Sequence, residues 1–153
     1  MRTFAAKVYS RQADLGSKPA LKPIVLPLRL PKIPYIMLFS QQTYVERRRK
    51  LRELVGKGLI LLFGNNDCPN NYPANVYKFR QDSSFLYFFG QKRDGLVGVI
   101  DADTGREVLV GNEIDIDDIV WYGSVQSVSD MAEACGAGES QPMAALAGMV
   151  EQA

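Results

Sequence analysis

The stretch of residues 79–90 restricts the possible folds of this chain more than any other part of the sequence. It begins with alternating apolar and charged residues and ends in five consecutive apolar residues, four of them aromatic, followed by a glycine. A short apolar run closed by a chain breaker is typical of a strand buried on both faces of a sheet. Arg80 and Asp82 precede the run and would share one face of an extended chain. We therefore predict a core strand whose entrance is neutralised by these two charges.

The composition favours one domain with its own hydrophobic core. The chain has 153 residues, 46% of them hydrophobic, and a net charge of +1, so we expect neither nucleic acid nor a membrane as a partner. Basic residues concentrate at the start: residues 1–36 contain seven Lys or Arg and one acid, whereas residues 37–153 contain eleven and sixteen. Cys68 and Cys135 form no CxxC pair, which favours a reduced, cytoplasmic protein.

The sequence contains no histidine. Histidine is the usual general base and the usual nitrogen ligand of zinc, manganese and iron. A Ser-His-Asp triad, an HExxH zinc site and a Cys-His pair are therefore excluded within this sequence. Any catalysis would have to use carboxylates, Lys, Tyr or Cys, or another domain.

Residues 1–36 carry five prolines between positions 19 and 34 and show neither helical nor strand periodicity. Their one apolar patch, residues 24–30, is interrupted by Pro27 and Arg29. It therefore lacks the continuous apolar core of a signal peptide or a membrane span. We predict a disordered leader. Two alternatives stay open: a genuine tail, or an upstream extension of a protein that starts at Met37.

The chain is expected to turn helical at Gln41, where Thr43 and Glu46 fit a capping box. One face of this helix is apolar, with Tyr44, Leu51, Leu54 and Val55. The cations of residues 46–50 could hold a phosphate, but they diverge around a helix, and we predict a solvated outer face. Gly56 is expected to end the helix.

The rest of the pattern predicts a mixed sheet. Residues 59–63 are expected to form a buried strand, and residues 64–76 a long polar loop that serves as a binding or contact loop. Residues 96–100 and 107–110 read as strands joined by a hairpin at 101–105. The aromatic run and these two strands would then be three consecutive antiparallel strands.

Residues 112–118 are acidic, and Glu113, Asp115 and Asp117 would share one face if extended. That pattern allows a calcium or manganese site, but the glycine and distal glutamate of an EF-hand loop are missing, so we favour a polar face. Short helices are expected at 130–136 and 143–152. The second reaches the last residues without a stop signal, which indicates a truncated chain.

These motifs, in this order, resemble the N-terminal domain of Xaa-Pro aminopeptidase (aminopeptidase P), of the creatinase/prolidase family. The resemblance covers residues 38–128. It rests on the run 79–90 and on the Arg-rich helix with Tyr44, the strand ending in Phe63-Gly64 and the acidic run before Trp121-Tyr122-Gly123. Phe89 stands where the family often has Thr, and Leu86 where some members carry an aromatic residue that lines the substrate pocket. If the aromatic run were helical, we would expect the family assignment to fail.

The resemblance implies a ribonuclease H-like α/β fold, with a mixed sheet flanked by helices. In this family a separate C-terminal domain holds two metal ions, commonly manganese, on two Asp, one His and two Glu, and a metal-bound hydroxide attacks the bond before proline. The N-terminal domain packs against that domain, takes part in oligomer contacts and narrows access to the active site. We therefore expect 1–36 to be a leader, 37–137 this N-terminal domain, and 138–153 the start of a further helix, with no catalytic or metal residue.

The resemblance also assigns roles to single residues. Substrate-access or interdomain contacts are expected from Tyr77, Arg80, Leu86 and the Asn70-Asn71-Tyr72 part of the loop. Structural roles are expected for Asp82, Phe85, Tyr87, Phe88, Gly90, Trp121 and Gly123, and a buried Tyr87 would need a hydrogen-bond partner.

Two other interpretations stay open. Catalytically inactive relatives of this fold occur among histone-chaperone subunits, so the chain could be a stand-alone interaction module. Prolidase or creatinase specificity is not separable from aminopeptidase specificity on these residues.

Overall fold

The computed structural model describes residues 5–9, 23–27, 37–114 and 126–152, and the chain divides into two compact units, Met1–Ile33 and Pro34–Ala153. In the first unit, β1 (Ala5–Tyr9) pairs antiparallel with β2 (Pro23–Pro27). The sequence predicts no regular structure in this segment, so these strands are missed. The reason is local: each strand is five residues long, and β2 begins and ends with proline.

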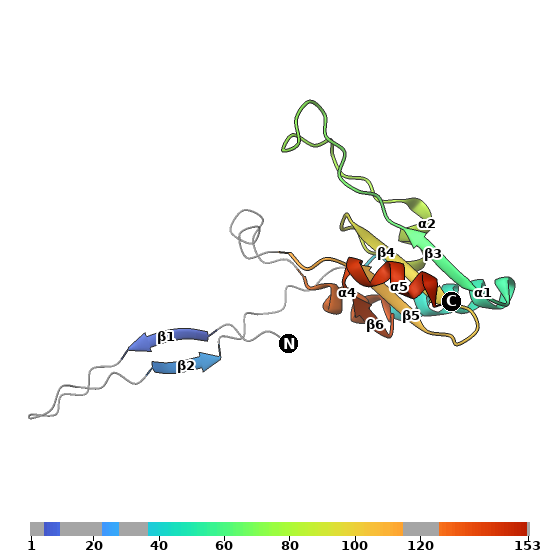
Figure 1. Cartoon of the computed structure of the whole chain (residues 1–153), viewed down its shortest axis with the longest axis horizontal. Helices are drawn as coiled ribbons and strands as arrows, with labels where there is room; N and C mark the ends of the chain where they lie inside the picture. The colour runs from blue at the N-terminus through green and yellow to red at the C-terminus, as the bar shows by residue number, and fades with distance from the viewer. Residues whose placement is uncertain (1–4, 10–22, 28–36, 115–125, 153) are drawn as a thin grey trace, which may run out of the picture. The chain divides into compact units, whose positions relative to one another are not determined.

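The second unit is a mixed four-stranded sheet flanked by helices (Figure 1), as predicted. The strand order is β3-β4-β5-β6, in which β3, β4 and β5 are antiparallel neighbours and β6 runs parallel to β5. In chain order its elements are α1 (Gln41–Val55), β3 (Leu59–Phe63), α2 (Ser83–Phe89), β4 (Leu96–Asp101), β5 (Glu107–Gly111), α4 (Val128–Cys135), β6 (Glu139–Gln141), the 3-10 turn η1 (Met143–Ala145) and α5 (Leu146–Glu151).

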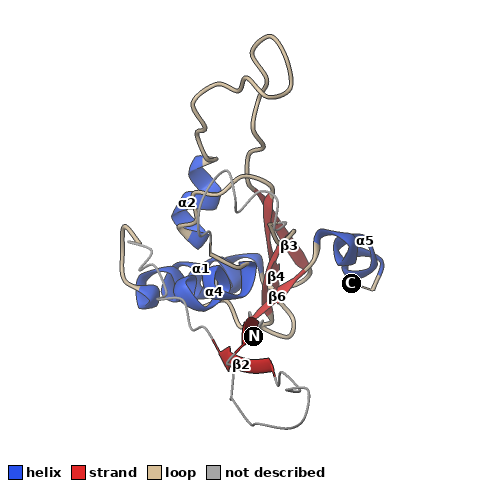
Figure 2. Ribbon diagram, turned by 90° about the vertical axis from the view of Figure 1, so that its left-hand side faces the viewer, coloured by secondary structure: helices blue, strands red, loops and turns tan. Residues whose placement is uncertain are grey.

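Both faces of the sheet are covered. Figure 2 shows α1, α2 and α4 on one side of the sheet and α5 on the other. Because side chains alternate along a strand, Leu96 and Ile100 of β4 join the cluster under α2 and α4, while Val97 and Val99 pack with Met143, Leu146 and Met149. Strands β4 and β5 are therefore buried on both faces, whereas the aromatic run was predicted to hold such a position.

The aromatic run is a helix, so the predicted core strand is wrong. Asp82 starts α2 by accepting a hydrogen bond from the Phe85 amide at 2.9 Å, and Gly90 ends it with a left-handed φ of 68°. Phe85 and Phe89 lie one helical turn apart, are fully buried and stack at 5.4 Å between ring centroids. Tyr87 lies on the opposite side and is half exposed, so the expected core role of Tyr87 is also wrong.

Helix α1 has its predicted start and end, but its cap and its buried face differ from the prediction. It begins at Gln41 with Ser40 as N-cap residue, so Thr43 lies inside the helix, and Glu46 pairs with Arg49 instead of reaching back. Of the predicted apolar face, Tyr44 is buried, but Leu54 and Val55 are exposed.

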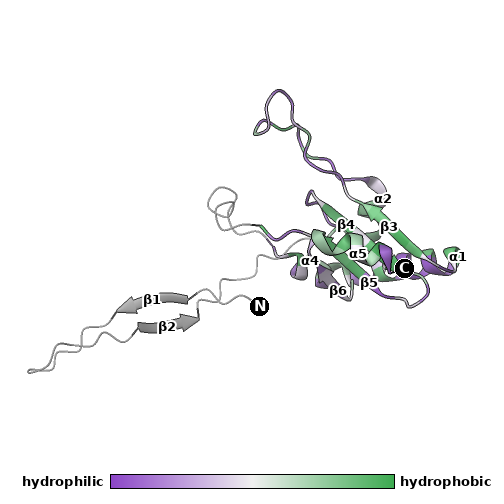
Figure 3. Cartoon of the chain, in the orientation of Figure 1, coloured by the Kyte–Doolittle hydropathy of each residue, from purple (hydrophilic) through white to green (hydrophobic). Residues whose placement is uncertain are grey.

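The other strands are confirmed with small shifts. Strands β4 and β5 each extend one residue beyond their predicted ends, and β3 has its predicted bounds but lies at an edge of the sheet and is only half-buried. Strand β6 is missed because three polar residues carry no strand periodicity. Figure 3 shows hydrophobic residues concentrated on β3, β4 and β5, and a mainly hydrophilic connection from β3 to α2. None of the described helices is long and apolar enough to span a bilayer.

Candidate functional site

The connection between β3 and α2, residues 64–82, projects away from the sheet (Figure 1) and is called the projecting loop here. Its outer half is an ordered hairpin. Pro69 and Val76 form an isolated antiparallel bridge, the Asn70 amide donates to the Asn75 carbonyl at 2.7 Å, and the Tyr77 amide donates to the Cys68 carbonyl at 3.0 Å. The loop is therefore held in one shape by its own backbone.

Gln81 joins the two ends of the projecting loop to each other and to the segment that precedes β4. This side chain is 4% exposed. Its Oε1 accepts hydrogen bonds from the amides of Asn65 at 2.6 Å and Asp82 at 3.0 Å, and its Nε2 donates to the Arg93 carbonyl at 2.7 Å. Gln81 is a functional residue that the sequence pattern does not predict directly. The one indication of its burial is an uncharged amide between two charged residues at the end of a long loop.

The surface of the projecting loop combines aromatic rings with amides. Tyr72 and Tyr77 are each 58% exposed and Val76 is 41% exposed. Asn70 and Asn71 are exposed beside them. Exposed aromatic side chains on a preformed loop bind a partner at low entropic cost, because the loop is already ordered. The geometry fits a contact surface for another protein segment.

The other predicted access residues lie apart from this tip. Arg80 is exposed at the base of the loop, where its carbonyl accepts a hydrogen bond from Asn65 Nδ2 at 2.8 Å. Leu86 is half-buried on α2. The Asp82 carboxylate caps α2, which replaces the neutralising role expected for it beside Arg80. The structure thus groups Tyr72 and Tyr77 with the asparagines, and places Arg80 and Leu86 nearer the sheet.

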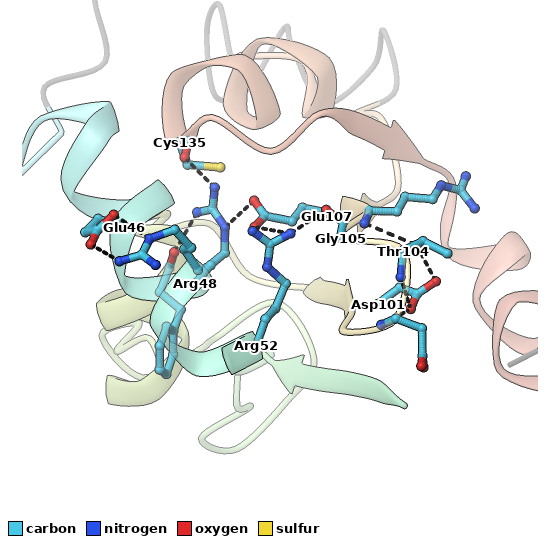
Figure 4. Close-up of polar contacts among 12 residues, drawn as sticks. Glu46, Arg48, Arg52, Asp101, Thr104, Gly105, Glu107 and Cys135 are labelled. Atoms are coloured by element: carbon cyan, nitrogen blue, oxygen red, sulfur yellow. Dashed lines mark hydrogen bonds and ion pairs between the residues drawn. The ribbon is translucent and has the colours of Figure 1, made fainter. Parts of the chain in front are cut away.

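Arg48 links α1 to α2, α4 and β5 (Figure 4). Its side chain is fully buried. Its Nε donates to Glu107 Oε2 at 2.7 Å, its Nη1 to the Phe88 carbonyl at 2.8 Å and its Nη2 to the Cys135 carbonyl at 3.0 Å. The last carbonyls of a helix have no partner within the helix. Arg48 satisfies one such carbonyl at the end of α2 and one at the end of α4.

The neighbouring arginines extend the same network. Arg47 Nη1 donates to the Tyr87 carbonyl at 2.9 Å, and its guanidinium lies 4.1 Å from the centre of the Tyr87 ring. Arg52 donates to the Gly105 carbonyl at 2.7 Å and lies 3.8 Å from Glu107. The predicted solvated face of residues 46–50 is therefore wrong for Arg48. Its spacing of four residues from the buried Tyr44 was the missed signal.

No nucleophile or metal centre emerges from the described residues. Burial raises the pKa of the Cys135 thiol, so this group is held as an unreactive thiol. Within residues 5–9, 23–27, 37–114 and 126–152, no three His, Cys, Asp or Glu side chains cluster as metal ligands. Glu113 instead lies 3.2 Å from the Val128 amide at the start of α4. The remaining members of the acidic run, and Trp121 and Gly123, lie outside the described residues.

Comparison with known proteins identifies the family to which this fold is similar. Residues 44–153 match the family model of the aminopeptidase P N-terminal domain. The Xaa-Pro dipeptidase of Homo sapiens is 28% identical over 103 residues, which are 67% of this chain and 21% of the relative. Aminopeptidase P from E. coli, in its low-pH form, superposes with a TM-score of 0.64 at 26% identity, over 74% of this chain and 27% of that one.

A zinc-substituted E. coli aminopeptidase P in complex with product gives a TM-score of 0.62 at 22% identity, a likeness of fold. The chain therefore spans 21% of the human relative and 27% of the bacterial structures. Most of each relative has no counterpart in this sequence.

Proposed function

Because the chain belongs to the aminopeptidase P N-terminal domain family, whose model matches residues 44–153, we propose that it is the non-catalytic N-terminal domain of an Xaa-Pro aminopeptidase. The helical aromatic run does not remove this assignment. The expectation that a helix would exclude the family was wrong, because residues 44–153, which include this helix, match the family model, and the fold is similar to that of E. coli aminopeptidase P.

In this proposal the domain forms subunit or interdomain contacts and restricts access to an active site that another domain provides. The projecting loop carries the proposal, because its exposed Tyr72 and Tyr77 are held on an ordered hairpin, and Gln81 ties the base of the loop to Arg93. Arg80 and Leu86 are the proposed access residues nearer the sheet.

The metal ions, two manganese ions in this proposal, belong to the C-terminal catalytic domain. The residues of this chain do not fit such a centre, because the sequence has no histidine and the described residues bring no ligand set together. A cytoplasmic location is part of the proposal. It is supported by the two free thiols, one exposed at Cys68 and one buried at Cys135.

The access role is tested by Arg80→Ala in a polypeptide that joins this domain to its catalytic domain. Arg80 is exposed, so its truncation should leave the melting temperature unchanged while raising KM for an Xaa-Pro peptide, with kcat nearly constant. Lys78→Ala is the matched control, since Lys78 is an exposed cation two residues away. Equal KM values for Arg80→Ala, Lys78→Ala and the parent would refute the access role.

The competing function is a stand-alone interaction module of the same fold. The observation that favours it is the projecting loop itself, which is built for contact whether or not a peptidase domain is attached. A binding partner that requires Tyr72 and Tyr77, together with an absence of Xaa-Pro hydrolysis by the natural polypeptide, would select this alternative. The relatives include both dipeptidases and aminopeptidases, so dipeptide and longer substrates should both be assayed.

A further inference from the structure

The projecting loop is a single antiparallel hairpin from its base to its tip. The residues that contact each other across its two limbs keep one register: Asn65 with Arg80, Cys68 with Tyr77, Pro69 with Val76 and Asn70 with Asn75. Neither limb carries an inserted residue between these pairs, so the loop extends from the sheet as one arm (Figure 1). The direction in which Tyr72 at the tip projects is therefore set by how the two limbs are held at the base.

The two limbs are attached to the sheet in different ways. The first limb continues β3, and there the Gly64 amide donates to the Leu96 carbonyl of β4 at 2.8 Å. The second limb, residues 75–82, makes no backbone hydrogen bond to a strand in the part of the chain that the structure describes. Before it enters α2, it is attached through the Gln81 side chain, which donates to the Arg93 carbonyl on the segment before β4.

The hydrogen bonds of Gln81 require an uncharged amide. Its Oε1 accepts from the amides of Asn65 and Asp82, and its Nε2 donates to the Arg93 carbonyl. A carboxylate would lack the donor, and an aliphatic side chain would leave all three backbone groups without this partner. The space for the amide depends on Gly64, because a Cβ at that position would lie 3.0 Å from both Nε2 and Oε1 of Gln81. The base of the loop is thus built around one glutamine.

We infer that Gln81 is a positioning residue for the peptidase reaction: it fixes the direction of the loop, so that Tyr72 and Tyr77 face the substrate at the active site of the catalytic domain. The inference rests on the access role proposed above, and it names the residue on which that role depends. If the second limb is released, the loop populates several directions. The apparent affinity for substrate then falls by the fraction of molecules in which the tip is correctly placed.

Kinetics of a polypeptide that joins this domain to its catalytic domain test the positioning role. Gln81→Met preserves most of the side-chain volume but removes the three hydrogen bonds, so it should raise KM for an Xaa-Pro peptide by about tenfold while kcat stays within about twofold of the parent. Gln91→Met is the matched control. Gln91 is fully buried, and its amide donates to the Met131 carbonyl at 2.9 Å, so its loss should lower the melting temperature without a change in KM. Equal KM values for the two variants overturn the inference.

A double-mutant cycle tests whether Gln81 acts through the tip of the loop. Replacement of both Tyr72 and Tyr77 by alanine should raise KM, because the exposed rings that contact the substrate are lost. In this background Gln81→Met should raise KM by less than about twofold further, since the loop no longer carries rings to position. If Gln81→Met still raises KM about tenfold without the two tyrosines, or if the loss of the tyrosines leaves KM unchanged, the inference is overturned.

Hydrogen exchange on the 153-residue chain tests the role of Gln81 at the base without any catalytic domain. In Gln81→Met, the amides of Asn65 and Asp82 lose their acceptor and should exchange about tenfold faster or more. The amides of Asn70 and Tyr77 should keep the exchange rates of the parent, because their partners lie within the hairpin. Unchanged exchange of the first two amides shows that Gln81 does not hold the base, and faster exchange of the second two shows that the hairpin unfolds without it. Either result overturns the inference.

These results are separable from the test of the proposed function. A raised KM for Arg80→Ala together with the parent KM for Gln81→Met overturns the positioning role alone. Faster exchange at the base in Gln81→Met, together with the parent KM for both variants, overturns the access role of the loop, on which the positioning role depends.

Discussion

Replacing Arg48 by methionine should destabilise the domain strongly, because it breaks a buried ion pair from one side. Arg48 is fully buried, and Glu107 is 8% exposed. The substitution removes the hydrogen bonds to Glu107 and to the carbonyls of Phe88 and Cys135. Removal of one partner of a buried pair costs about 3–5 kcal/mol. Because Arg52 stays 3.8 Å from Glu107, we expect a loss near the lower limit.

The free energy of unfolding, measured by urea denaturation followed by far-UV circular dichroism, should therefore fall by about 3 kcal/mol, with a decrease in melting temperature of about 10 °C. Arg49→Met is the matched control on the same helix. Arg49 is exposed and pairs with Glu46 and Glu53 at the surface, so its loss should leave the free energy of unfolding almost unchanged.

A second variant separates loss of the pair from loss of packing. Arg48→Met/Glu107→Leu removes both charges, so no carboxylate is left buried and unpaired, and it should be clearly more stable than Arg48→Met alone. If Arg48→Met costs no more than Arg49→Met, or if the double variant is less stable than the single one, the assigned role of Arg48 is refuted.

Three further predictions concern the loop base, the thiols and the β6 contact. Gln81→Ala should speed proteolysis within the projecting loop and lower the unfolding free energy by about 1–3 kcal/mol. The reason is that the Asn65 amide and the Arg93 carbonyl lose their buried partner. Unchanged cleavage would contradict the role of Gln81 in holding the base of the loop. One thiol, Cys68, should react with a maleimide in the native state, whereas Cys135 should react only on unfolding, because it is buried and burial raises its pKa; mass spectrometry showing prompt labelling of both would contradict this. The hydrogen-bonded ion pair with Arg106 lowers the pKa of Glu139 from 4.5, so the contribution of this pair to stability is present above the pKa of the unfolded state and is lost as the pH falls through the lower folded pKa. Glu139→Gln should therefore be less stable than the parent at neutral pH and equally stable in strong acid. A stability difference that stays constant at all pH values would contradict this assignment.

Local patterns were sufficient for much of the sheet. Alternating and continuous apolar segments identified β3, β4 and β5 within one residue, and the helix predicted for residues 130–136 corresponds to α4, which begins two residues earlier, at Val128. The Arg-rich helix was also found with its predicted start at Gln41, although Ser40 and not Thr43 is its N-cap residue. Each of these elements is specified mainly by its own residues.

The errors arose where distant contacts decide the structure. The aromatic run has the composition of a strand, but capping by Asp82 and the burial of Phe85 and Phe89 on one side select a helix. Gly98 of β4 provides the space for the Phe89 ring, since a Cβ there would collide with it, and no pattern within residues 79–90 reveals that space.

The burial of Arg48 was equally hidden, because its partners come from α2, β5 and α4, at 40, 59 and 87 residues along the chain. The projecting loop, in contrast, was predicted from its length and composition, and its role as a contact element stays a prediction. The clamp at its base was not, since Gln81 bonds to Asn65 at the opposite end of the loop and to Arg93 on the segment before β4.

The hydrolysis of an Xaa-Pro peptide by the purified 153-residue chain, with manganese supplied, most directly tests the claim that this is an accessory domain. The account predicts a rate equal to the buffer blank for the chain alone, and turnover under the same conditions once the domain is joined to its catalytic domain. Turnover above the blank by the chain alone would contradict it.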